Sequence, residues 1–324
     1  MSGSRATVGV DLGGTHIRVA VVDDDGTIRH EHRGASPSHS IDELVGAVAS
    51  ATTDLVAAAR ADGLTVEAIG AGVAALVDDD GVARYAPNVP ALVNAPLRDD
   101  IAGATGLHAI VDNDANVAAW GELAHGAMQG MRHALLLTLG TGIGGGIVLD
   151  GRVYRGAHGF AAEVGHWQFD PRGRMCACGE PGHWEAWGSG TALGVLAREV
   201  VARGEAPSVL AAAGGDPDAV SGEHVSAAAL DGAADALAIL DTFADFVATG
   251  FAGLANILDP EAIVISGGLV NLGDVLVSRI RARFPEHLEG RAFRPEIPIV
   301  AATLGDQAGV IGAAVLARQV DPAS

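Results

Sequence analysis

The chain has 324 residues, of which 49% are hydrophobic and 19% are charged. This length exceeds what one hydrophobic core usually serves, so we expect two domains or one large α/β unit, and the composition excludes a disordered chain. All 20 basic residues are arginine, against 40 acidic residues, which gives a net charge of −20. The absence of lysine excludes a Walker A phosphate loop and a Schiff-base mechanism, and the negative charge disfavours nucleic acid or a membrane surface as a partner.

The first third of the chain alternates between strand and helix patterns. Strands are expected at residues 7–11 and 17–22, joined by a Gly-Gly-Thr turn and followed by an Asp-Gly turn and a third strand. Ser40 and Glu43 match a capping box, which predicts the start of a helix over about 41–61. The next expected elements are a strand near 68–73, a loop containing Ala86-Pro87-Asn88, a helix after Pro96, a strand at 108–111 and a helix from Asp114.

A similar design recurs further along. An apolar strand at 134–139 enters the glycine-rich turn 140–146, and the chain leaves as strand 147–149 into an Asp-Gly turn. Because strand, glycine turn, strand and Asp-Gly hairpin repeat about one domain apart, we expect a duplicated phosphate-binding hairpin. The remaining expected elements are helices at 191–203 and 235–258 with a loop around 204–224 between them, a strand at 262–266, a helix at 273–284, a strand at 297–301 and a C-terminal helix.

The second glycine turn formally contains the dinucleotide fingerprint G-x-G-x-x-G, at Gly140, Gly142 and Gly145. That motif needs a helix directly after the glycines, whereas β-branched Ile147-Val148 and a hairpin turn follow here. A glycine hairpin can still bind phosphate, because successive backbone N–H groups form an anion-binding nest. The alternative is an ordinary tight turn.

His166, Cys176, Cys178 and His183 form a second candidate site, with nine, one and four residues between them. Thiolates and imidazoles at such spacing suit tetrahedral Zn²⁺, and four protein ligands indicate a structural metal. The alternative is a reduced Cys-x-Cys turn without metal. Two cysteines so close together do not form a normal structural disulfide, so we expect a reducing, cytoplasmic environment.

Asp114 lies where we expect the strand near 108–111 to end and the following helix to begin. Aspartate at such a position is often only a helix N-cap. The alternative is a general base, because a carboxylate between two phosphate hairpins can accept a proton from an attacking hydroxyl group.

Asp11-Leu12-Gly13-Gly14-Thr15, the turn 140–146 and Ile265-Ser266-Gly267-Gly268 together resemble the sugar-kinase, actin and heat-shock ATPase superfamily. Within it, residues 8–317 resemble the ROK (repressor, open reading frame, kinase) sugar kinases, in their actinobacterial glucokinase form. The resemblance implies a two-domain, actin-like ATPase (ribonuclease H-like) α/β fold with a cleft between the domains. The smaller domain would comprise residues 1–116 and 305–324, and residues 117–304 would form the larger domain with the zinc motif.

The resemblance also implies an activity, which is ATP- and Mg²⁺-dependent phosphorylation of a hexose with Asp114 as general base. Glucose is the hexose that the resemblance favours most. Fructose, N-acetylmannosamine or N-acetylglucosamine kinases of the family are alternatives, and so is a non-catalytic sugar-binding regulator. A ROK repressor would carry a DNA-binding domain before the first hairpin, whereas only ten residues precede Asp11. The implied assembly is a homodimer or homotetramer.

The residues that the resemblance implies fall into two groups. For the nucleotide they are Asp11 facing magnesium, Gly13, Gly14, Thr15, Gly140, Thr141 and Gly142 at the phosphates, and Gly267 and Gly268 at adenosine. For the sugar they are Asn88, Asn113, Asp114, Glu163, His166 and Glu185.

The chain departs from the family pattern at three single positions and at one segment, where Ala74-Ala75-Leu76 replaces the usual Gly-Pro-Gly before Val77-Asp78. His16 stands where lysine is usual after Gly-Gly-Thr, Ala162 where glycine is usual in the sugar-binding signature, and His183 where a third cysteine is usual in the metal motif.

Overall fold

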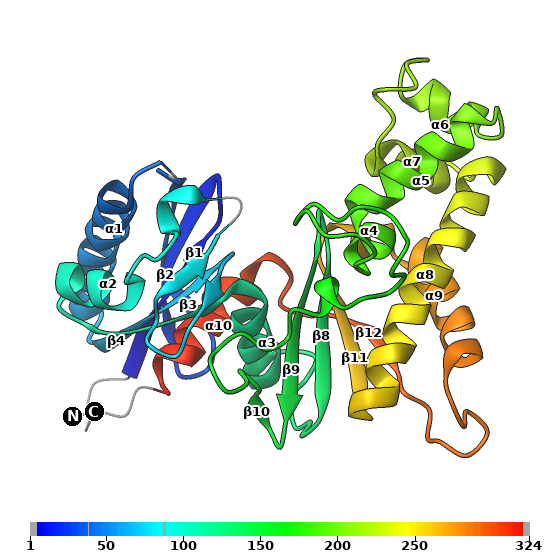
Figure 1. Cartoon of the computed structure of the whole chain (residues 1–324). Coiled ribbons are helices and arrows are strands. Elements are labelled where there is room, and N and C mark those ends of the chain that lie inside the picture. The colour runs from blue at the N-terminus through cyan, green and yellow to red at the C-terminus, as the bar shows by residue number, and fades with distance from the viewer. Residues whose placement is uncertain (1–4, 38, 87–88, 320–324) are drawn as a thin grey trace. The chain divides into compact units, whose positions relative to one another are not determined.

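The computed structural model describes residues 5–37, 39–86 and 89–319 (Figure 1). The chain divides into two compact units. Unit 1 contains Met1–Arg132, Gly146–Ala162 and Ala302–Ser324, and unit 2 contains His133–Gly145 and Glu163–Ala301. The expected boundary after residue 116 falls inside a helix of unit 1, α3 (Asp114–His125), which packs against the C-terminal helix α10 (Ala308–Ala317). The unit boundary therefore lies after this helix, at residue 132.

Unit 1 is built on a five-stranded sheet with the order β3-β2-β1-β4-β7. Strands β1 and β2 pair antiparallel, whereas β1, β4 and β7 are parallel. Its strands are β1 (Arg5–Leu12), β2 (His16–Asp23), β3 (Ile28–Ala35), β4 (Thr65–Val73) and β7 (His108–Asn113), with a small hairpin of β5 (Leu76–Val77) and β6 (Ala83–Tyr85). Its helices are α1 (Ile41–Ala61), α2 (Leu97–Thr105), α3 and α10.

Helices cover both faces of this sheet, as the βα alternation predicts (Figure 1). The alternation of side chains along β2 shows how: Val19 and Val21 belong to the core shared with α1, whereas Ala20 and Val22 pack against α10. Ser40 caps α1 by accepting a hydrogen bond from the Glu43 backbone N–H, 3.3 Å away. The N-cap is therefore confirmed, although the reciprocal bond from the Glu43 side chain is not formed.

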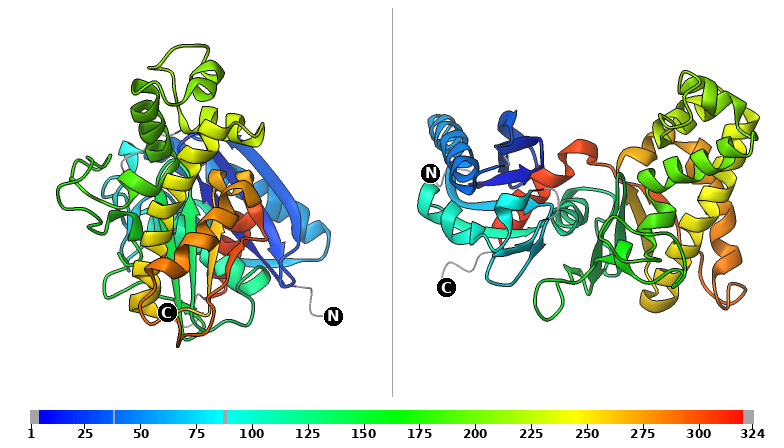
Figure 2. Two further views of the ribbon diagram at one scale, coloured as in Figure 1. Left: turned by 90° about the vertical axis from the view of Figure 1, so that its right-hand side faces the viewer. Right: turned by 45° about the horizontal axis from the view of Figure 1, so that its top comes forward.

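Unit 2 holds most of the second five-stranded sheet, which has the order β10-β9-β8-β11-β12. Its strands are β8 (Ala134–Leu139), β9 (Ile143–Leu149), β10 (Arg152–Val153), β11 (Ala262–Ser266) and β12 (Ile299–Ala301), of which β10 and the end of β9 belong to unit 1. The helices of unit 2 are α4 (Glu185–Gly188), α5 (Gly190–Ala202), α6 (Pro207–Ala212), α7 (Gly222–Leu230), α8 (Ala234–Leu258) and α9 (Asp274–His287). Figure 2 shows α8 and α9 side by side, in agreement with their contacts.

The two sheets repeat one topology. In each, the strand before the glycine turn lies third, the returning strand and its hairpin partner lie on one side, and two parallel strands lie on the other. The duplicated hairpin expected from the sequence is therefore confirmed at the level of strand order.

Two expectations about local structure were wrong. The second glycine turn does not extend to Gly146, because β9 already begins at Ile143. Gly146 is a strand glycine whose absent Cβ lets α3 approach: a Cβ there would lie 2.5 Å from that of Ala119. The segment 204–224 is not a loop throughout, since Pro207 stands in the first turn of α6, where proline is favoured, and α7 begins at Gly222.

By length and apolar composition, α1 and α8 would each be long enough to cross a membrane. Both pack within their units, where α8 buries residues such as Phe243, Val247 and Phe251 completely. A buried core helix of a water-exposed domain has the same composition.

Candidate active site

The turn between β1 and β2 is the first of the two glycine hairpins. Leu12 pairs with Ile17, and the Gly13 N–H donates to the His16 carbonyl at 3.0 Å. Within the described part of the chain, the N–H groups of Gly14 and Thr15 have no hydrogen-bond partner. Two successive N–H groups without an internal partner are available to bind an anion. His16, which replaces the usual lysine, places Nδ1 2.9 Å from the Thr15 hydroxyl oxygen.

Asp11 lies at the end of β1, beside the first turn of α10. A Cβ on Gly309 would come within 2.9 Å of Asp11 Oδ2, so the carboxylate lies directly against this glycine. Burial raises the pKa of Asp11, and the nearby charge of Asp114 raises it further, while Arg18 lowers it. Two partly dehydrated carboxylates near each other favour a bound cation, which fits the magnesium role expected for Asp11.

Asn113, and not Asp114, is the N-cap of α3. Asn113 Oδ1 accepts hydrogen bonds from the N–H groups of Ala115 at 2.9 Å and Asn116 at 3.3 Å. Its Nδ2 donates to the Ala75 carbonyl at 3.2 Å. Asp114 is instead the first residue of the helix; solvent reaches it, but the surrounding protein removes enough hydration to raise its pKa.

Asp112 and Arg155 form an ion pair that sequence reasoning missed. Asp112 is completely buried, and its Oδ2 lies 2.9 Å from Arg155 Nε. Arg155 also bonds Asp79 Oδ1 at 3.0 Å and the Asp78 carbonyl at 3.3 Å. The pair fixes the segment before the sugar-binding signature to the end of β7. Its partners are 43 residues apart (155 minus 112), so no local pattern signals it.

The second glycine hairpin opens on a cavity of about 870 Å³. The Gly140 N–H donates to the Gly142 carbonyl at 3.0 Å, and the N–H groups of Thr141 and Gly142 have no partner among the described residues. Gly140 and Thr141 line the cavity together with Gly268. The structure thus brings the expected phosphate turn and the expected adenosine glycine to one cavity within unit 2.

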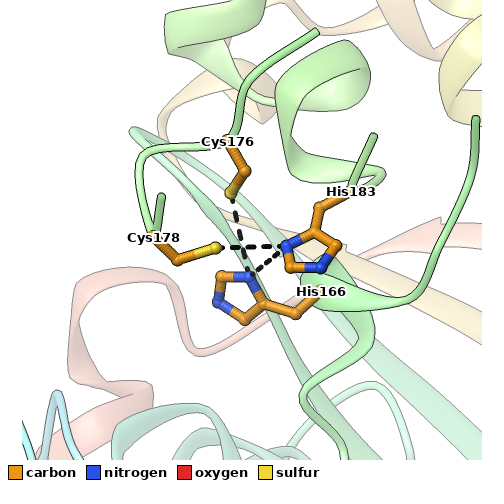
Figure 3. Close-up of side chains that lie close together, drawn as sticks. All are labelled: His166, Cys176, Cys178 and His183. Atoms are coloured by element: carbon orange, nitrogen blue, oxygen red, sulfur yellow. Dashed lines mark hydrogen bonds between the residues drawn. The ribbon is translucent and has the colours of Figure 1, made fainter. Parts of the chain in front are cut away.

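The four candidate metal ligands lie together in unit 2, and Figure 3 shows their side chains pointing toward one another. Their ligand atoms all lie within 4.8 Å of one another. His166 Nδ1 is 3.4 Å from His183 Nδ1 and 3.8 Å from Cys176 Sγ, and His183 Nδ1 is 3.2 Å from Cys178 Sγ.

These three distances are close to the edges of a tetrahedral site. The edges of a tetrahedron around Zn²⁺, with bonds of about 2.0 to 2.3 Å, are about 3.3 to 3.8 Å long. Burial raises the pKa of the Cys176 thiol to about 12, so this sulfur becomes a thiolate only with a cation beside it. The donor set of two sulfurs and two imidazoles fits zinc.

The expected sugar residues of unit 2 border this cluster. His166 turns Nδ1 toward the cluster and Nε2 toward Glu163, whose Oε2 is 4.0 Å away. Glu185 begins α4, and its carboxylate accepts a hydrogen bond from the Ile143 N–H at 2.9 Å. Asn88, a further expected sugar residue, lies outside the described residues.

A family model described as the ROK family matches residues 7–320. The chain belongs to the ROK family. It is 40% identical to a glucokinase of Streptomyces coelicolor over 319 residues, which cover 98% of each chain. A glucokinase of Thermotoga maritima is 34% identical over 314 residues, which cover 96% of this chain and 97% of that protein.

A solved structure described as a ROK family glucokinase from Streptomyces griseus in complex with glucose and AMPPNP is 39% identical to this chain, with a TM-score of 0.82. The match covers 97% of this chain and 100% of that one. The two-domain, actin-like ATPase fold expected from the sequence is therefore confirmed for this ROK protein.

Ala162 shows the cost of departing from the usual ROK pattern. Its φ is +73°, in the left-handed region that favours glycine. Ala162 thus carries a methyl group at a backbone position whose conformation favours glycine.

Proposed function

We propose that this ROK protein is an ATP-dependent hexose kinase that converts glucose to glucose 6-phosphate. The observation that carries the proposal is that each glycine hairpin offers two adjacent unpartnered N–H groups, and that Asp114 stands free of the capping role beside the first hairpin's Asp11. Full-length identities of 40% and 34% to glucokinases support glucose as the substrate.

In this proposal the Asp114 carboxylate accepts the proton of the glucose O6 hydroxyl as that oxygen attacks the γ-phosphorus of ATP. The bond from the γ-phosphorus to the bridging oxygen breaks, and ADP leaves with the bond electrons. Phosphoryl transfer depends mainly on positioning and charge stabilisation, so one base and well-placed N–H donors suffice. Asn113 contributes by fixing the first turn of α3 and hence the direction of Asp114.

Asp11 would hold the magnesium ion, which neutralises charge on the transferred phosphoryl group when bound. The raised pKa of Asp11 fits this role, since a cation restores the charged form that burial disfavours. Gly13, Gly14 and Thr15 would face phosphate from unit 1, and Gly140, Thr141 and Gly142 from unit 2. Gly267 and Gly268 would pack against adenosine.

Glu163, His166 and Glu185 would bind sugar hydroxyls from unit 2, with Asn113 from unit 1 and Asn88. His166 serves two purposes, because Nδ1 faces the cluster while Nε2 remains for a hydrogen bond. We propose that the cluster holds one structural Zn²⁺, whose role is to fix this wall of the sugar site. Elemental analysis of the purified protein tests it, with about one zinc per chain expected.

A coupled assay over a panel of sugars and phosphoryl donors tests the proposed activity. We expect glucose with ATP to give the highest kcat/KM, above fructose, N-acetylmannosamine and N-acetylglucosamine, and above ADP or polyphosphate as donor. A preference for an N-acetylated sugar would reassign the substrate within the family. Sugar binding without turnover by any donor would indicate a regulator instead.

We also propose that the enzyme acts in the cytoplasm as a homodimer or homotetramer, without nucleic acid or membrane. The net charge of −20 supports the absence of polyanionic partners. Light scattering in solution tests the assembly, and a monomeric mass at micromolar concentration would contradict it.

A further inference from the structure

One short stretch of unit 2 holds the second glycine turn at three points. The Gly190 N–H donates to the Gly140 carbonyl at 2.7 Å, and the Thr191 hydroxyl donates to the Thr141 carbonyl at 2.8 Å. The Ile143 N–H donates to Glu185 Oε2 at 2.9 Å. Every support comes from residues 185–191, where α4 ends and α5 begins.

These bonds fix the direction of the free N–H groups. No peptide bond among the described residues is cis, and the C=O and N–H of a trans peptide point in opposite directions. When Thr191 holds the Thr141 carbonyl, the Gly142 N–H of the same peptide must point away from α5. The Gly140 carbonyl, held by Gly190, orients the Thr141 N–H in the same way.

The supporting stretch is itself firmly anchored. Trp184 precedes it, is completely buried, and donates from Nε1 to the Phe246 carbonyl of α8 at 3.1 Å. Ser189 caps α5 by accepting from the Ala192 N–H at 3.1 Å. Thr191 is therefore not needed as a cap, and its exposed side chain lines the cavity beside Gly140 and Thr141. A loss of the Thr191 hydroxyl removes one bond to the turn without opening the core.

We propose that Thr191 is a positioning residue for phosphoryl transfer, whose hydroxyl holds the Thr141–Gly142 peptide so that the Gly142 N–H faces the phosphates of the donor. This rests on the proposed function, because it takes the second turn to be a phosphate site. Thr191 acts through the peptide and not by touching the phosphate.

The test compares Thr191→Val with Thr191→Ser. Valine keeps the branched shape and removes the donor, whereas serine keeps the donor. One neutral hydrogen bond contributes about 0.5 to 1.5 kcal/mol, which is about two- to tenfold, so kcat/KM for ATP should fall by about that factor in Thr191→Val. KM for glucose should change less than twofold, and Thr191→Ser should retain most of the wild-type value. Thr242→Val is the matched control, because Thr242 is an exposed helix threonine of unit 2 whose hydroxyl donates only to its own helix, at Ala238.

Two further measurements separate positioning from direct contact. AMPPNP should bind Thr191→Val about two- to tenfold more weakly, while adenosine should bind all variants equally. In the ligand-free protein, the amide proton of Gly142 should move upfield in Thr191→Val alone, because a hydrogen bond to the carbonyl polarises the N–H of the same peptide. Unchanged ATP kinetics in Thr191→Val would overturn the proposal, and so would weakened AMPPNP binding with an unmoved Gly142 resonance.

Failure of the proposed function gives a different result. In that case the wild type phosphorylates no sugar, while the AMPPNP and adenosine titrations still report on Thr191. A wild type that is active, with a Thr191→Val variant indistinguishable from it, rejects the positioning role alone.

Discussion

The two glycine hairpins occupy equivalent positions in the two sheets, but they are supported differently. The first is closed by its own backbone, through Gly13 and His16, and by one bond from the Ser36 N–H to the Thr15 carbonyl at 2.9 Å. The second is held by Glu185, Gly190 and Thr191, which lie more than 40 residues further along the chain. Both hairpins are closed by one internal backbone bond, from the Gly13 and Gly140 N–H groups, but the second is also held by residues more than 40 positions away.

The charges near the two hairpins differ as well. Two carboxylates with raised pKa values, Asp11 and Asp114, accompany the first hairpin. The second is accompanied by a cluster that becomes formally neutral with Zn²⁺, two thiolates and two imidazoles. Under the proposed function, unit 1 would supply the carboxylates for the proton and the cation, and unit 2 would supply the residues that border the metal cluster and bind the sugar.

The largest effect should come from Asp114→Asn. An amide cannot accept the proton, so kcat should fall about 10²-fold or more, while glucose affinity stays near the wild-type value. The measurement is steady-state kinetics together with calorimetric glucose binding. Near-native turnover would reduce Asp114 to a structural residue.

The same variant should be more stable than the wild type at neutral pH. Because the folded-state pKa of Asp114 is raised above its ordinary value of 3.8, the wild type loses stability as pH rises through the raised pKa. Asparagine does not titrate, so the gain in Tm should be largest at neutral pH and shrink toward pH 3.8. The acid limb of the wild-type pH–rate profile should likewise lie above pH 3.8.

How much of this the sequence predicts depends on the range of the interactions involved. The helix at 41–61, the apolar strands and the repeated hairpins follow from local patterns, and the structure has them where expected. The ligand set of the cluster also follows from spacing. The long-range contacts do not follow from local patterns. Thr191 contacts Thr141, 50 positions away, and Arg155 contacts Asp112, 43 positions away. Gly146 was misassigned for the same reason, since its need for glycine comes from α3 packing against the strand.

An intermediate effect should come from His183→Ala, which tests the support of the second unit. The variant should lose about one zinc per chain and raise KM for glucose about tenfold. Mutation of the groups that support a metal site typically lowers metal affinity or activity 10- to 100-fold. KM for ATP should rise less. The cluster reaches the second glycine turn through Glu185, whose Oε1 lies 3.5 Å from Cys176 Sγ and whose Oε2 accepts from the Ile143 N–H. His183→Cys, the usual residue of the family, is the control that should keep metal and activity. Wild-type protein without zinc, fully active under strong chelation, would contradict this role.

The smallest effect should come from Ala162→Gly. Glycine adopts the φ of +73° without strain, so the free energy of unfolding should rise by about 0.5 to 1 kcal/mol despite the greater freedom of the unfolded chain. Urea denaturation measures it. Ala161→Gly is the matched control, because Ala161 has no positive φ and should lose stability. Equal effects at the two positions would show that the left-handed backbone at Ala162 carries no strain.

The most direct test of the account is an amide NMR titration with AMPPNP and magnesium, repeated with adenosine. If both hairpins are phosphate sites, the N–H resonances of Gly14, Thr15, Thr141 and Gly142 should all move with AMPPNP and stay in place with adenosine. Resonances that move equally with both ligands, or that remain fixed while AMPPNP binds, would contradict the assignment of the free N–H groups to phosphate.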